Sequence, residues 1–261
     1  KMLIMRYLVL FLFFIMTFVD GIMLTERNVI SLRGRIDGDS TTNFIKKINL
    51  HEEETLYIYV TSPGGSVIDG LHIIEQIETL TYRGIKVYCI ADFAASMAFA
   101  IFQACPTRYT TSASILMQHQ MSLNGLEGNL YNIENYIDFI RQTDNRLDKH
   151  QAERLNLTVE KFQQNIMNDW WMSGTDILLN GASDELVRVY CQPSLVEKQD
   201  IITVQSLFFE AEVVFSKCPL IREPLSLTLT VKNNTTQTIS PSILDAFFPS
   251  KYISMIKKER I

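Results

Sequence analysis

Two junctions, at which an apolar β-like run ends in a turn and a helix-like run begins, constrain the fold of this chain most. The first joins the apolar run at residues 56–60 to a helical pattern that begins at Ser66. The second joins the run at residues 85–90 to a helical pattern that begins at Ser96. Strands that alternate with helices over short crossovers are typical of an α/β fold, which we expect for most of the chain.

The turn of the first junction contains two glycines, Gly64 and Gly65, which allow the backbone to approach a ligand closely. Ser66 fits a helix cap, and the unpaired NH groups of a helix start gather at such a turn. These NH groups can stabilise an oxyanion, and the NH of Met97 at the second junction can join that of Gly65. Taken alone, the second junction is more simply interpreted as a small-residue helix start on a sheet.

A histidine ends the apolar run that begins at residue 115. His119 lies between two glutamines, whereas the other three histidines lie in an acidic loop, on a helix and near a charged helix end, at His51, His72 and His150. A strand end brings His119 to the same sheet edge as Ser96, where an imidazole can act as the base for a serine nucleophile. Such a base needs an orienting carboxylate. Asp169 is the best candidate, although an aspartate before a Ser-Gly pair is otherwise a simple turn residue.

Five motifs follow one another in the order and spacing of one known family. They are Ser-Pro-Gly-Gly-Ser at 62–66, Ala-Ala-Ser-Met at 94–97, Gln-His-Gln at 118–120, Asn-Asp-Trp-Trp-Met-Ser at 168–173 and Gly-Ala-Ser-Asp-Glu-Leu-Val at 181–187. With them, the chain from residue 27 to about 188 resembles the proteolytic subunit of the Clp protease, a serine peptidase of the ClpP/crotonase-like superfamily. By this resemblance Ser96 is the nucleophile, His119 the general base and Asp169 its orienting residue, while Gly65 and Met97 form the oxyanion hole.

The resemblance implies a ClpP-like fold of repeated ββα units and endopeptidase activity on unfolded or short polypeptides. It also implies a homo-oligomeric ring and an ATP-driven unfoldase of the AAA+ class as a partner. The chain departs from the family at Ala98, where glycine is usual, and at residues 104–109, where the family's loop is longer. Residues 121–130 and the helix after them correspond to the handle that joins two rings in the family, although the apolar stripe of this helix fits packing on its own sheet equally well.

Composition limits the remaining classes of function. With 261 residues and 47% hydrophobic content, the chain can bury a full core and carry an appendage. The net charge of −5, without a basic run interleaved with aromatics, argues against nucleic-acid binding. The four cysteines are widely spaced, so we expect no metal site and no cofactor. Cys89 and Cys105 are expected in the core, while Cys191 and Cys218 could pair in an oxidising compartment.

The two ends of the chain differ most from the family. Residues 7–19 form an apolar run behind Lys1 and Arg6, which is the layout of a secretory signal and is short for a membrane span of about 20 residues. We therefore expect a signal peptide or membrane anchor at 1–22, a ClpP-like serine peptidase domain at 23–190 and a β-rich C-terminal extension of unknown role at 191–261. The peptidase would be extracytoplasmic or membrane-anchored if the first segment is real, and cytoplasmic if translation begins at Met23.

The coarse pattern predicts individual elements. Strands are expected at 29–33, 56–60, 85–90, 109–111, 115–119 and 186–190, and in the extension at 201–204, 211–215 and 225–231, with a polar turn at 233–238. Helices are expected at 41–48, 66–80, 96–104, 132–151, 159–168 and 174–180.

Three alternatives to a Ser-His-Asp endopeptidase remain open. A membrane-associated Ser-Lys peptidase of the same superfamily would share both junctions and use a lysine base, for which Lys149 is the nearest candidate. A non-hydrolytic crotonase-like protein would bind an acyl-thioester in the same oxyanion hole. A catalytically inactive ring subunit would only assemble with an active paralogue.

Overall fold

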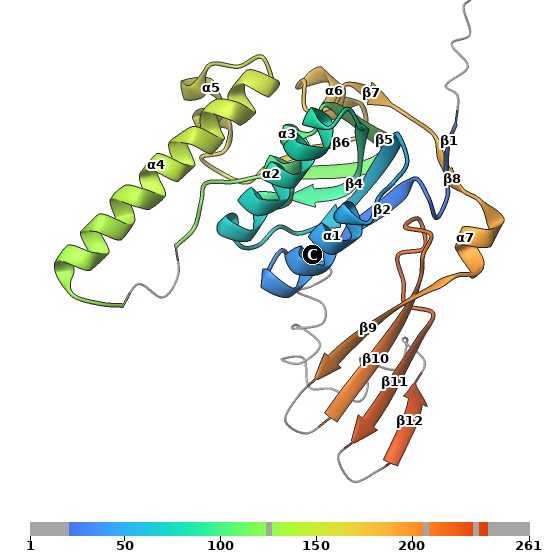
Figure 1. The fold of residues 1–261 in the computed structure, drawn as a ribbon. Helices are drawn as coiled ribbons and strands as arrows, with labels where there is room; N and C mark the ends of the chain where they lie inside the picture. The colour runs from blue at the N-terminus through green and yellow to red at the C-terminus, as the bar shows by residue number, and fades with distance from the viewer. Residues whose placement is uncertain (1–20, 124–126, 206–208, 232–234, 240–261) are drawn as a thin grey trace, which may run out of the picture.

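The computed structural model describes residues 21–123, 127–205, 209–231 and 235–239, so the predicted signal or anchor segment lies almost wholly outside them. A six-stranded sheet forms the body of the molecule, with the order β2-β3-β4-β5-β6 and with β7 beside β5 (Figure 1). Its strands are β2 (Val29–Arg33), β3 (Thr55–Ser62), β4 (Lys86–Ala95), β5 (Thr107–Gln118), β6 (Trp170–Ser173) and β7 (Glu185–Leu186).

Strands β2 to β5 pair in parallel, whereas β6 pairs antiparallel with β5. Parallel neighbours need crossover connections, and three helices supply them. These are α1 (Gly38–Asn49), α2 (Val67–Tyr82) and α3 (Met97–Ala104), which lie together over the sheet in Figure 1. The core between the helices and the sheet contains fully buried side chains such as Ile58, Ile73, Ile77, Phe99 and Phe102. The predicted α/β class is confirmed.

Helix α4 (Leu130–Arg154) projects from the body, and α5 (Val159–Asn165) lies beside its C-terminal half (Figure 1). The N-terminal half of α4 carries the exposed apolar side chains Leu130, Tyr131, Tyr136 and Phe139. Part of the apolar surface on this half of α4 is therefore not covered by the chain's own sheet, whereas Ile133, Ile137 and Ile140 are half-buried. Within the described part of the chain, no helix combines the length and the apolar character that a bilayer crossing requires.

The C-terminal region forms a separate antiparallel sheet. The chain leaves the body through α6 (Thr175–Leu179) and β8 (Val189–Cys191), which pairs in parallel with β1 (Ile22–Leu24), and then through α7 (Pro193–Glu197). The sheet that follows has the order β12-β11-β10-β9, with β9 (Gln199–Gln205), β10 (Phe209–Ser216), β11 (Ser226–Val231) and β12 (Thr235–Ile239). This sheet confirms the predicted β-rich extension.

Covalent and ionic contacts fasten the extension to the body. Cys191 and Cys218 form a disulfide across the start of the extension, as the sequence suggested. The Glu26 carboxylate, close to β1, accepts hydrogen bonds from the ammonium groups of Lys198 and Lys217. The two lysines lower the pKa of Glu26 to about 2, with the hydrogen bond from Lys198 as the largest cause. The extension is thus tied to the chain at both ends of its first hairpin.

A second attachment reaches the strand that precedes Ser96. The Arg222 guanidinium, in the segment between β10 and β11, donates a hydrogen bond to Oδ1 of Asp92 on β4. The Asp92 side chain is buried, and its Oδ2 has no hydrogen-bond partner among the described residues. Burial raises the pKa of Asp92, and Arg222 opposes this shift without cancelling it. The guanidinium of Arg33 also lies 4.8 Å from the ring centroid of Phe215.

Several predicted boundaries are wrong. The two strands expected at 109–111 and 115–119 are one strand, β5, in which the pairing with β4 steps from Ala91–Thr110 to Phe93–Ile115 and leaves residues 111–114 as the extra residues of this irregular step. The Ser114 hydroxyl donates to the Ala91 carbonyl at 2.6 Å and satisfies the backbone there. The turn predicted at 233–238 is wrong for residues 235–238, because residues 235–239 form β12 and pair with β11. The segment expected at 186–190 is divided between β7 and β8.

Cys89 and Cys105 are fully buried, as predicted, but they are not free core residues. They form a disulfide with a Cα–Cα distance of 6.0 Å. Cys89 lies on β4 and Cys105 directly follows α3, so the disulfide closes a covalent loop that contains Ser96. The pairing depends on how α3 folds back over β4, which the sequence spacing of the two cysteines does not reveal.

Candidate active site

Ser96 occupies the junction between β4 and α3 in a conformation that is unfavourable for a residue with a side chain. Its φ is +55° and its ψ is −123°. Gly174, between β6 and α6, has nearly the same backbone, with φ +52° and ψ −125°. Glycine adopts this conformation at little cost, whereas another residue loses about 1–3 kcal/mol. A serine is therefore held where a glycine would fit the backbone better.

The surroundings of Ser96 fix this turn. Its NH donates to the Met117 carbonyl on β5 at 3.0 Å, and Ala95 pairs with Met117 in the parallel register. Residues 97–103 of α3 are all buried, so the helix is enclosed by the core on every side. The small residues Ala95 and Ala98 are buried as well and leave room for the close approach of neighbouring backbone. Packing therefore holds Ser96 against the unfavourable dihedral angles.

The glycine turn lies directly against the Ser96 turn. A Cβ atom built on Gly64 would lie 2.5 Å from the Ala95 carbonyl oxygen and 2.8 Å from the Met97 nitrogen. Gly64 has φ +88° and Gly65 has φ +151°, so both positions favour glycine. The predicted closeness of the two turns is therefore found in the structure.

The hydrogen bonds of the glycine turn leave one donor free. The Ile36 NH donates to the Gly64 carbonyl at 2.9 Å, and the Ser66 NH donates to the Ile36 carbonyl at 2.8 Å. The Gly65 NH lies between these two bonds, and neither it nor the Met97 NH has an acceptor among the described residues. Ser66 caps α2 as predicted, because its hydroxyl accepts from the Asp69 NH. Two unpaired backbone donors thus belong to the two adjoining turns.

His119 directly follows the end of β5 and is half-buried. Its Nδ1 lies 2.6 Å from the carbonyl oxygen of Gln120. Since a carbonyl oxygen can only accept, Nδ1 carries the proton in this bond, and in the neutral imidazole the lone pair is then on Nε2. The neighbouring Gln118 is bonded to Gln151 of α4, and its Oε1 accepts from the His119 NH at 3.1 Å. The sequence shows both glutamines beside His119, but the sequence analysis did not predict that the Gln118 side chain and the Gln120 carbonyl would bond to this histidine.

Asp169 directly precedes β6 and is exposed. Gln118 pairs with Trp170 in the antiparallel register, so continuation of this register sets Asp169 opposite His119. No hydrogen bond among the described residues joins Ser96, His119 and Asp169. The structure thus brings the three residues to one sheet edge without linking their side chains. Trp171, two residues after Asp169, is 52% exposed.

A buried ionic network holds the other end of β5. The Arg108 guanidinium is 5% exposed, donates to the Asp184 carboxylate and also bonds the Gly181 carbonyl at 3.0 Å. Burial alone would raise the pKa of Asp184, but hydrogen bonds from Arg108 outweigh it and hold the pKa below its ordinary value. The motif at 181–187 is therefore structural, because it anchors the strand whose far end leads to His119.

A lysine base and a bound metal ion are two other ways in which this region could act. Lys149 of α4 is exposed and has no hydrogen bond or ion pair within the described part of the chain. Among the described residues, no group of three or more His, Cys, Asp or Glu side chains is arranged to hold a metal ion. The chemistry available at the edge is that of a hydroxyl, an imidazole, a carboxylate and two backbone donors.

Comparison with known proteins gives a consistent assignment for this region. A family model described as Clp protease matches residues 18–189. The ATP-dependent Clp protease proteolytic subunit 2 of Synechococcus sp. (strain CC9605) is 29% identical over 170 residues, which cover 63% of this chain and 85% of that protein. Subunit 2 of Parasynechococcus marenigrum (strain WH8102) and subunit 1 of Synechococcus sp. (strain CC9902) are 27% and 26% identical over the same shares. The matched residues include both turns, His119 and Asp169 and end before β9.

Proposed function

The chain belongs to the Clp protease family and is a serine-type peptidase, and from this premise we propose that Ser96, His119 and Asp169 cleave peptide bonds of unfolded or short polypeptides. The observation that carries the proposal is the backbone of Ser96. A serine kept at φ +55°, where the matching junction at Gly174 uses glycine, indicates that the hydroxyl is needed there. The unpaired NH groups of Gly65 and Met97 support the same assignment.

In the proposed reaction, the Ser96 hydroxyl attacks the carbonyl carbon of the substrate while His119 Nε2 accepts its proton. The NH groups of Gly65 and Met97 donate to the oxyanion that forms. His119 then protonates the leaving amine, and an ester to Ser96 remains. A water molecule, deprotonated by His119, hydrolyses this ester and restores the free hydroxyl.

The orienting role of Asp169 requires a rearrangement of the His119 side chain. Nδ1 of His119 is bonded to the Gln120 carbonyl, so it must exchange this acceptor for the Asp169 carboxylate. Both partners lie at the end of the β5–β6 ladder, so a side-chain rotation is the only change that we propose. Incomplete catalytic hydrogen bonds are common in unliganded active sites and do not exclude a base.

Active-site labelling tests the proposal. A fluorophosphonate probe is expected to label the purified protein at Ser96, and Ser96→Ala should abolish the labelling. Ser173→Ala, which removes an exposed serine of β6, is the matched control and should keep it. His119→Ala is expected to abolish acylation and Lys149→Ala to leave it unchanged. Labelling lost in Lys149→Ala but kept in His119→Ala would replace the histidine base by a lysine base.

Exposed apolar side chains on α4 support assembly with further copies of the chain. We propose a homo-oligomeric ring in which the exposed side chains of Leu130, Tyr131, Tyr136 and Phe139 are covered by a neighbouring subunit. Native mass measurement should detect the oligomer, and Phe139→Glu should shift it toward smaller species. Protein that assembles but is never labelled at Ser96 would indicate an inactive ring subunit.

The two disulfides support a location in an oxidising compartment. Together they pair all four cysteines of the chain. We propose that residues 1–22 export or anchor the peptidase, which would separate it from a cytosolic AAA+ unfoldase and favour substrates that are already loose. Alkylation of the native protein without reductant, followed by mass measurement, should find no free thiol. Four alkylated cysteines would contradict this location.

A further inference from the structure

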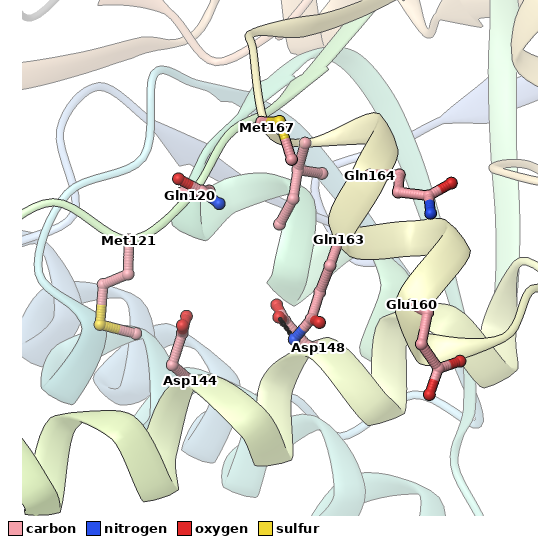
Figure 2. A pocket seen from close by; sticks show the side chains of 9 residues that line it. Gln120, Met121, Asp144, Asp148, Glu160, Gln163, Gln164 and Met167 are labelled. Carbon is pink, nitrogen blue, oxygen red and sulfur yellow. Dashed lines mark hydrogen bonds between the residues drawn. The ribbon is translucent and has the colours of Figure 1, made fainter.

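A cleft of about 530 Å³ lies between the segment that follows His119 and the two helices α4 and α5. Gln120 and Met121 form one side, Asp144 and Asp148 of α4 form the floor, and Met167 lies at the top, as Figure 2 shows. Its walls therefore continue directly from the chain segments that carry His119 and precede Asp169. A polypeptide bound at the proposed catalytic residues has this cleft beside it.

The cleft contains two carboxyl groups for which the described residues supply no counter-ion. Asp148 is only 5% exposed, and its Oδ2 accepts from Gln163 Nε2 at 2.9 Å. Its second oxygen has no hydrogen-bond partner, and neither Asp148 nor Asp144 forms an ion pair within the described residues. Burial raises the pKa of both carboxyl groups, so each would be stabilised in its ionised form by a nearby cation. A buried carboxylate without a counter-ion is costly to maintain.

No lysine or arginine of the described residues lines this cleft. Lys149 and Lys161, on the two helices that border it, are exposed and are not among the residues that line it. The remaining walls are largely apolar or amide, and they include Met121, Ile166 and Met167. Methionine side chains adapt to flexible aliphatic groups, and long basic side chains place such stems on apolar surface with their charge at a polar end. The cleft thus combines a wall for a stem with an acidic floor.

We propose that this cleft binds a lysine or arginine side chain of the polypeptide substrate close to the scissile bond, with Asp148 and Asp144 receiving the cationic group. The inference rests on the proposed peptidase function and names the substrate class of the same site. Asp148 is the principal specificity residue, because it is the more deeply buried of the two. Glu160, at the margin of the cleft in Figure 2, adds negative charge at its rim.

Matched peptides test the inference. Two pairs of fluorogenic peptides differ only near the scissile bond, with lysine against norleucine and arginine against citrulline, which keep the stem but remove the charge. The wild-type protein is expected to cleave the charged member of each pair with a kcat/KM at least about tenfold higher. Asp148→Asn should reduce this ratio to about two or less, and Asp144→Lys should reduce it below one because it places a cation in the cleft.

The control removes a carboxylate of α4 that lies outside the cleft. Glu153→Gln, at an exposed position near the end of the helix, should keep both the ratio and the rate. Probe labelling of Ser96 is measured in every variant, which separates this inference from the proposed function. A wild-type ratio near one, or a ratio unchanged in Asp148→Asn while Ser96 still reacts, would overturn the inference alone. Absence of both labelling and cleavage in the wild type would overturn the proposed function and this inference with it.

Discussion

The body and the C-terminal extension are both built on sheets, but they are stabilised in different ways. In the body, helices cover the parallel strands and bury side chains such as Phe99 and Ile58 completely. The extension is antiparallel, and Ile201 on its first strand remains 57% exposed. Antiparallel sheets tolerate one face in water, whereas parallel sheets need cover. Burial of apolar side chains therefore stabilises the body, whereas the extension depends on its disulfide and on its ion pairs with Glu26 and Asp92.

The largest effect is expected where the body has least space. Gly64→Ala would force a Cβ atom against the Ala95 carbonyl oxygen and the Met97 nitrogen, so the two turns must move apart. Loss of one oxyanion donor typically lowers kcat by about 100-fold or more, and we expect at least this loss in peptide hydrolysis. Gly84→Ala is the control, because its φ is also positive but no atom lies within 4 Å of the added Cβ. Equal activity in the two variants would contradict the oxyanion geometry.

The next largest difference is expected when large apolar side chains are truncated in the two regions. Phe99→Ala empties a fully buried site in the body, and we expect a loss of about 3–5 kcal/mol in the free energy of unfolding. Ile201→Ala, on the exposed first strand of the extension, should change the stability by about 0.5 kcal/mol or less. Denaturant titration followed by tryptophan fluorescence measures both. Similar losses would mean that the extension is part of the same core.

Removal of the disulfides should distinguish attachment from internal stability. The double variant of Cys191→Ser and Cys218→Ser is expected to release the extension, and hydrogen exchange should speed up in β9 and β10 while the melting temperature of the body stays unchanged. The double variant of Cys89→Ser and Cys105→Ser should instead destabilise the body by about 3 kcal/mol on the chain-entropy model. Loss of protection throughout the body in the first variant would contradict the separation.

The smallest expected effect is a pH dependence of the attachment between Glu26 and the extension. The folded-state pKa of Glu26 lies near 2, below its ordinary value of 4.5, so its ionised form favours attachment of the extension above that value. This contribution falls as the pH falls from 4.5 through 2. Glu26→Gln should therefore weaken the protection of β9 at neutral pH and remove its pH dependence in this range. Hydrogen exchange measures both, with Glu212→Gln on β10 as the control, and no difference between the variants would exclude a role for this ion pair.

The sequence predicted the alternation of elements better than their limits. The strand at 29–33 is reproduced at both ends, because alternating apolar residues mark it clearly. The continuity of β5 was missed, because polar residues such as Ser112 interrupt the apolar pattern, whereas the pairing with β4 resumes at Ile115 after an irregular step. The short strand β6 has too few residues to show a period. Its pairing with β5 is a tertiary property.

The sequence proposes the candidate site as a set of residues, which stays a prediction, but not the arrangement of their side chains. Family motifs predicted Ser96, His119 and Asp169 as site residues, and the strand register brings all three to one edge. The bond from His119 to the Gln120 carbonyl was not predictable, because a histidine rotamer depends on neighbours that the fold supplies. The Cys89–Cys105 pairing was missed for the same reason.

The contact between Arg222 and Asp92 has a practical consequence for anyone who dissects this protein. A clone trimmed to the family-matched region, residues 18–189, would lose Arg222 while retaining Asp92 on the strand that leads into Ser96. The shortened protein would carry an uncompensated carboxylate on the strand that leads into Ser96 and would bind a proton there more readily than the intact chain. The extension should therefore be included in any expression design, because its Arg222 supplies the positive charge that pairs with Asp92 of the peptidase region.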